Sequence, residues 1–100
     1  DGVYQQIAVS DISFLMEDNQ FFVAGNSGVN RFNGIVKVQG NKIIIENLAS
    51  TRMMGSEEEM EYENLFLQTL TGVSTFKIND NKLKIINADK KLELNFIRKN

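Results

Sequence analysis

Short segments in which apolar and polar residues alternate, separated by pairs rich in Asn, Asp and Gly, constrain the fold of this chain most strongly. Ile12–Met16 and Gln20–Ala24 alternate in this way on either side of Asp18-Asn19, which predicts a β-hairpin. Because the turns between neighbouring segments are short within each half of the chain, we expect antiparallel pairing there. Further strands are predicted at Val3–Val9, Phe32–Gln39, Lys42–Asn47, Ser74–Ile78, Leu83–Ile86 and Leu92–Ile97.

One segment, Ser56–Leu70, has the period of a helix instead. Ser56 and Glu59 have the spacing of a capping box, which satisfies free N–H groups at a helix start. Gly72 suits the left-handed residue that ends a helix. The buried stripe of this helix is expected to hold Met60, Phe66, Leu67 and Leu70.

A single helix of about four turns cannot cover a flat sheet built from all of these strands. We therefore predict an α+β fold in which a strongly bent antiparallel sheet forms an incomplete β-barrel packed on one α-helix. The chain has 100 residues, 42% of them apolar, and no linker divides it. It is expected to form a single domain, 1–100.

The composition excludes several kinds of chemistry, because the chain has no His, Cys, Trp or Pro. It can form no Ser-His or Cys-His nucleophile pair, no metal site with imidazole or thiolate ligands, and no disulfide. We expect no catalytic residue, no metal and no cofactor. A net charge of −2 gives no general attraction to nucleic acid, and no run approaches the roughly 18 apolar residues of a membrane span.

Charge is distributed unevenly along the chain. Five of the 13 acids lie between Glu57 and Glu63, and seven of the 11 bases follow Phe76. Solvated surfaces are the simplest interpretation, and a basic docking surface is the alternative. The pairs Glu57/Glu61 and Glu59/Glu63 share helix faces by their spacing. We interpret them as solvated rather than as a Ca²⁺ site or an acid–base pair, because no calcium-binding loop accompanies them.

Two motifs link the chain to a known family. Gly25–Gly34 reads G-N-S-G-V-N-R-F-N-G after a predicted hairpin, and Leu48–Met54 reads L-A-S-T-R-M-M before the acidic helix start. In this order they resemble the META domain, the family of the bacterial heat-shock protein HslJ and related envelope lipoproteins, over roughly Ile12–Ile97. The resemblance implies the bent sheet and single helix predicted above. It also implies a place in the periplasm or an anchor at the outer membrane, and no established activity.

The chain departs from the family pattern in three places. Val29 stands where the family often has Cys, and a second Cys near Gly55 is missing too, which argues against a cysteine-dependent role. The usual Trp-bearing first strand is either diverged, at Val3–Val9, or missing. A missing strand would leave an open sheet edge suited to strand exchange or dimerisation. The chain begins at Asp1 rather than Met, as expected of a processed or trimmed chain.

The glycine-rich motif contains the first candidate site. Asn30 is expected to hold a tight loop together through local hydrogen bonds. The alternative is a binding rim to which Arg31 and Phe32 contribute contacts.

The second motif contains the other candidates. Ser50 and Thr51 are expected to fasten the loop that enters the helix, Arg52 to pair with nearby acids, and Met53 and Met54 to pack against other side chains. The alternatives are a catalytic hydroxyl and a two-methionine Cu(I) site. The candidate binding residues from both motifs are Asn30, Arg31, Phe32, Arg52 and Met53.

A half-open barrel plugged by one helix can leave an apolar groove, although a filled core is the simpler outcome. Its candidate lining is Met16, Phe21, Phe66, Leu67, Leu70, Phe76 and Phe96. These features favour a non-enzymatic META-domain envelope protein, linked to envelope stress or resistance, that binds a partner protein or an apolar ligand. It would be a monomer or a strand-paired homo-oligomer. The alternative is a small hydrolase that uses Ser50 or Thr51 with a carboxylate.

Overall fold

The computed structural model describes residues 10–98, so the strand predicted at Val3–Val9 lies outside the described residues. The elements, in chain order, are β1 (Ser10–Glu17), β2 (Gln20–Ser27), β3 (Arg31–Gln39), β4 (Lys42–Ser50), α2 (Glu57–Thr69), β5 (Val73–Asn79), β6 (Lys82–Asn87) and β7 (Leu92–Ile97).

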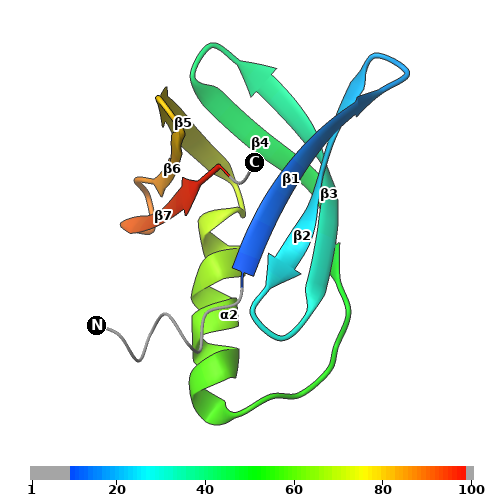
Figure 1. The fold of residues 1–100 in the computed structure, drawn as a ribbon, viewed down its shortest axis with the longest axis vertical. Coiled ribbons are helices and arrows are strands. Elements are labelled where there is room, and N and C mark those ends of the chain that lie inside the picture. Colours follow the sequence, from blue (N-terminus) through cyan, green and yellow to red (C-terminus); the bar gives the residue numbers. More distant parts are fainter. Residues whose placement is uncertain (1–9, 99–100) are drawn as a thin grey trace.

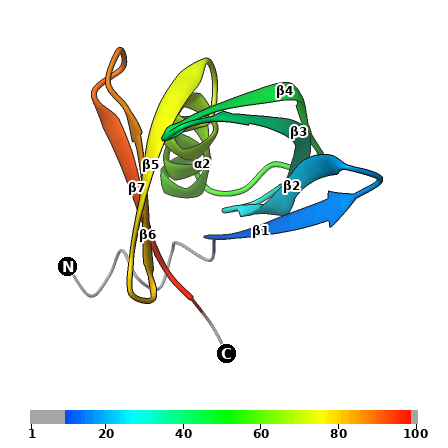
Figure 2. The same cartoon turned by 90° about the horizontal axis from the view of Figure 1, so that it is seen from above.

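The seven strands of residues 10–98 form one antiparallel sheet in which each strand pairs with the next strand along the chain. The sheet bends strongly, and α2, which connects β4 to β5, lies inside the bend (Figures 1 and 2). The edge strands β1 and β7 do not pair with each other, so the barrel stays incomplete over these residues. The predicted α+β fold is confirmed.

The core lies between the concave face of the sheet and α2, and Phe66 is at its centre. The ring centroid of Phe66 lies 5.3 Å from that of Phe32 on β3 and 6.1 Å from that of Phe96 on β7. The helix therefore contacts both halves of the bent sheet. The buried apolar side chains are Val23, Phe32, Val36, Ile43, Ile45, Phe66, Leu70 and Ile85.

Side chains form hydrogen bonds with backbone groups at both ends of α2. The Ser56 hydroxyl accepts a hydrogen bond from the Glu59 N–H at 3.1 Å, and the Glu59 carboxylate accepts one from the Ser56 N–H at 2.8 Å, so the predicted capping box is confirmed. Beyond the other end, the buried Asn87 amide donates to the Thr71 carbonyl at 2.8 Å. Gly72 has a φ of 84°, in the left-handed region, as its place after the helix predicts.

The first four strands are longer than the sequence pattern indicates. Between the predicted strands Gln20–Ala24 and Phe32–Gln39, only residues 28–30 remain as a loop, because β2 continues to Ser27 and β3 begins at Arg31. Similarly, β4 continues to Ser50. Small polar residues have low strand propensity, but pairing with β1 overrides it here. Gly25 has no Cβ to collide with the backbone carbonyl of Asp11, which allows this close pairing. Over residues 10–98 no helix has the length and apolar character needed to cross a membrane.

Candidate functional site

The turn between β2 and β3 is fastened to α2 by one buried carboxylate, that of Glu63. The Glu63 side chain is 4% exposed. Its Oε1 accepts hydrogen bonds from the Ser27 hydroxyl at 2.8 Å, the Val29 N–H at 3.0 Å and the Asn30 N–H at 2.6 Å. Its Oε2 accepts from the Asn30 amide at 2.6 Å. The sequence-based interpretation of Glu63 as a solvated residue was wrong, because these donors replace its water.

Asn30 extends this network to the loop that enters α2. Its Oδ1 accepts from the Thr51 hydroxyl at 2.8 Å and from the Met53 N–H at 2.6 Å. Its Nδ2, which bonds Glu63, also donates to the Met53 carbonyl at 3.0 Å. One side chain thus joins the β2–β3 turn, the segment after β4, and the helix. We call Asn30, Thr51 and Glu63 the polar clasp.

The pKa of Glu63 reflects two opposing effects. Burial raises the pKa of this carboxyl, but hydrogen bonds from Asn30, Ser27 and Val29 stabilise the charged form and hold the pKa below the ordinary value of 4.5. No cation is needed to explain the ionised carboxylate, because its hydrogen bonds come from amide and hydroxyl donors. The clasp is therefore a structural element that depends on a negative charge.

Acid is expected to weaken this clasp. Because the folded pKa of Glu63 is depressed, its contribution to stability is complete above pH 4.5 and is lost as the pH falls through the folded pKa. The free energy of unfolding, measured by urea titration from about pH 6 to about pH 3, should fall more steeply in the wild type than in Glu63→Gln. Parallel curves for the two proteins would contradict this assignment.

The structure brings the two motifs side by side, since Asn30 hydrogen-bonds the Met53 backbone and Arg31 hydrogen-bonds Thr51, but it gives the five candidate binding residues different environments. Arg31, Arg52 and Met53 are exposed, and Asn30 is buried in the clasp. Phe32, expected on a binding rim, is 2% exposed and belongs to the core, since it lies on the concave side of β3. Arg52 forms no ion pair with another residue of the described chain, contrary to expectation.

The alternatives for the second motif find no support in the geometry. The Thr51 hydroxyl donates to an amide oxygen, which cannot take up its proton, and no carboxylate or lysine of residues 10–98 hydrogen-bonds Ser50 or Thr51. Met53 is exposed and Met54 is 83% exposed, so neither packs as expected; only the backbone of Met53 is held. In the described part of the chain, no cluster of three or more His, Cys, Asp or Glu could hold a metal.

A second candidate site lies at the end of the sheet opposite the start of α2. In an up-and-down sheet, the turns that follow β1, β3 and β5 share one end, and the start of α2 lies at the opposite end (Figure 1). We call the three hairpins 14–23, 36–45 and 76–85 the hairpin end. They enclose an open cavity of about 360 Å³. All nine of its lining residues belong to these hairpins and are apolar: Phe14, Phe21, Val36, Val38, Ile43, Phe76, Ile78, Leu83 and Ile85.

This cavity differs from the groove predicted from the sequence. Phe21 and Phe76 line it as expected. Phe66 and Leu70 instead fill the core, because α2 plugs its own end of the barrel. The other predicted lining residues lie elsewhere: Met16 is exposed and Leu67 packs on the core. Phe96 faces a second, mixed-polarity groove between β1 and β7, which shares Phe14, Ile78 and Leu83 with the cavity.

The lining residues of the cavity differ in how deeply they are buried. Its floor is buried, at Val36, Ile43 and Ile85, and its rim is exposed, at Val38 and Ile78. Apolar side chains that stay exposed around a concave apolar floor are typical of a site that receives an apolar group.

Comparisons with known proteins agree with this architecture. The family model of the META domain matches residues 5–100, and the chain therefore belongs to the META domain family. A structure solved by NMR shares 28% sequence identity and a TM-score of 0.68, over 86% of this chain and 69% of that one. A second NMR structure, of a protein from Burkholderia xenovorans, has 16% identity and a TM-score of 0.63, over 98% of this chain and 87% of that one. It shows the same fold. No curated protein gives a significant match.

Proposed function

We propose that this META domain is a non-enzymatic binding protein of the bacterial cell envelope, which takes up an apolar ligand at the hairpin end. Membership of the META domain family is the ground on which we propose an envelope location, in the periplasm or at the outer membrane, and a role under envelope stress. The cavity at the hairpin end carries the binding proposal, since all of its lining residues are apolar and its rim is open.

The chemistry of the lining defines the ligand class. No hydrogen-bond donor or acceptor side chain lies among the nine lining residues, so recognition rests on apolar surface and shape. An aliphatic chain or an apolar side chain of a partner protein meets this requirement, whereas a polar metabolite would lose its hydration without compensation. We take the acyl chain of a fatty acid as the simplest representative.

A fluorescent fatty acid whose emission rises in apolar surroundings tests this function. We expect saturable binding that oleate competes away. Val38→Glu, which places a charge at the cavity rim, should weaken binding at least tenfold, by roughly 1.4 kcal/mol or more. The matched control is Val73→Glu: Val38 is 49% and Val73 48% exposed, both lie on strands, and only Val38 lines the cavity.

Binding within about twofold of wild type is expected for Val73→Glu, because a single exposed charge outside the cavity changes little. Absence of displacement by oleate, or equal losses in the two variants, would rule out the cavity as a ligand site.

A further inference from the structure

The hairpin end holds most of the exposed large apolar residues of the described chain. Seven of the twelve such residues in the described chain lie in the three hairpins. Two of them, Leu15 at 59% and Met16 at 57% exposed, lie beside the β1–β2 turn and do not line the cavity. A ligand in the cavity would therefore leave these two side chains of the β1–β2 hairpin exposed. The seven residues are Phe14, Leu15, Met16, Phe21, Val38, Ile44 and Ile78.

The same hairpins are basic, although the whole chain is acidic. They hold five lysines and three acids, while the chain as a whole has 11 bases and 13 acids. The hairpin end therefore has a charge of about +2 and the remainder about −4 at neutral pH. The lysines are Lys37, Lys42, Lys77, Lys82 and Lys84, and the acids are Glu17, Asp18 and Asp80.

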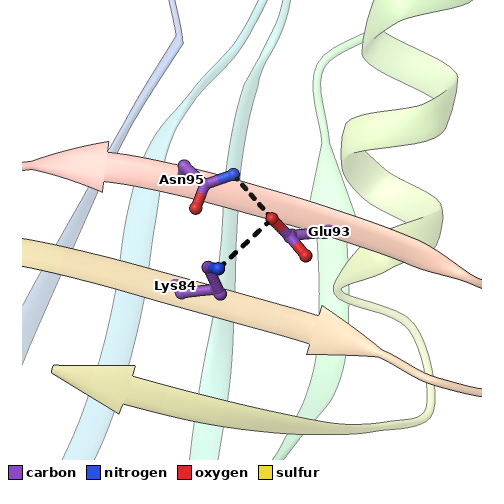
Figure 3. Close-up of polar contacts among 3 residues, drawn as sticks. All are labelled: Lys84, Glu93 and Asn95. Carbon is purple, nitrogen blue, oxygen red and sulfur yellow. Dashed lines mark hydrogen bonds and ion pairs between the residues drawn. The ribbon is translucent and has the colours of Figure 1, made fainter.

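Two of these lysines repel each other in the folded chain and so lower its stability. Lys77 and Lys84 lie directly opposite each other on β5 and β6, where like charges repel. Glu93 on β7 offsets one of them: its Oε2 lies 3.6 Å from the Lys84 Nζ and also accepts a hydrogen bond from Asn95 at 3.0 Å (Figure 3). Lys77 has no ion pair within residues 10–98. An anionic partner would relieve the repulsion between these two exposed lysines, so their arrangement favours such a partner.

We propose that the hairpin end docks onto the surface of an anionic lipid bilayer. Exposed apolar side chains on all three hairpins, together with five lysines on β3 to β6, fit such an interface, because the apolar side chains enter the boundary between headgroups and acyl chains while the lysines meet anionic headgroups. A second copy of this chain is a poorer partner, since two ends of the same positive charge repel. The acidic start of α2, with Glu57, Glu58 and Glu61, lies at the opposite end and points away from the bilayer (Figure 1).

Cosedimentation of the full chain with lipid vesicles tests the docking. Vesicles of phosphatidylcholine with about one third phosphatidylglycerol should bind the protein at low salt, and pure phosphatidylcholine vesicles should bind it far less. Binding should fall as salt is raised, because ions screen surface charges. In Lys42→Glu/Lys77→Glu, partitioning should drop by roughly 25-fold or more, at about fivefold for each lysine lost.

The matched control reverses two exposed charges at the other end of the sheet. Arg31→Glu/Arg52→Glu makes the same change in net charge but should keep most of the binding. Leu15→Glu should reduce partitioning to anionic vesicles, whereas Leu65→Glu, on the exposed side of α2, should not. Circular dichroism spectra and urea midpoints, compared with wild type, check that each variant is folded.

Docking and ligand uptake are separable in this design. Lys42→Glu/Lys77→Glu should still bind the fluorescent fatty acid in vesicle-free solution within about threefold, since neither lysine lines the cavity. No cosedimentation with anionic vesicles at low salt would overturn the docking proposal, as would equal losses in the two charge-reversal pairs. Light scattering that shows self-association abolished by Leu15→Glu, without vesicle binding, would assign the surface to a second copy and overturn it as well.

Discussion

Replacing Glu63 by Ala is expected to lower the free energy of unfolding by about 3 kcal/mol, because each buried donor left without its acceptor costs about 1–3 kcal/mol and such losses do not add fully. The donors are the Ser27 hydroxyl, the Val29 and Asn30 N–H groups, and the Asn30 amide. Urea unfolding at neutral pH measures the effect as a lower midpoint at an unchanged slope. A loss of this size is a large share of the roughly 5–15 kcal/mol that stabilises such a domain.

Glu61→Ala is the matched control for this substitution. Glu61 lies two residues earlier on α2 and is exposed, so its removal should change stability by less than about 0.5 kcal/mol. Glu63→Gln should fall between the two, since its amide keeps one acceptor oxygen but cannot accept from Asn30 at the second position. Equal stability of Glu63→Ala and Glu61→Ala would show that the clasp contributes nothing.

Phe66→Ala should destabilise the protein by about 3–5 kcal/mol, the range for a large aromatic residue removed from a core. The Phe66 ring is 1% exposed and packs on Phe32, Phe96 and Tyr62, the last with a centroid separation of 6.3 Å. Its loss leaves a void between the two halves of the sheet, which rigid strands cannot close. Thermal and urea unfolding followed by circular dichroism measure this change.

The neighbouring residue provides the control for the core substitution. Leu65 is half exposed on the same helix, and Leu65→Ala should cost much less than Phe66→Ala. Phe66→Leu should be intermediate, because it retains most of the apolar volume. Similar losses at positions 65 and 66 would mean that helix propensity, rather than packing, determines the effect.

Most of the fold follows from local sequence signals. Alternation of apolar residues and the Asp18-Asn19, Gly40-Asn41 and Asp80-Asn81 pairs predict three of the hairpins, and the structure has a turn at each. The capping box predicts the helix start at the correct residue. These signals suffice because each depends on residues only a few positions apart. The extent of β2 and β4 depends on pairing between strands, which such local patterns do not contain.

The two candidate sites were harder to predict, for different reasons. Glu63 lies between Met60 and Phe66 on the apolar stripe of the helix, and a lone acid on such a stripe indicates a buried carboxylate; its partner Asn30 lies 33 residues away and could not be identified. The cavity was expected among helix residues such as Leu70. Its true position depends on how far α2 reaches into the barrel, which no spacing in the sequence encodes.

The pairing between β4 and β5 is the shortest in the sheet, with only three residue pairs, Lys42↔Thr75, Ile43↔Ser74 and Ile44↔Val73. This junction divides the barrel wall into a four-strand panel and a three-strand panel, and each panel supplies part of the cavity lining. Few backbone hydrogen bonds join the two panels there, so the packing of Phe66 of α2 on Phe32 in one panel and Phe96 in the other contributes much of what holds the panels together.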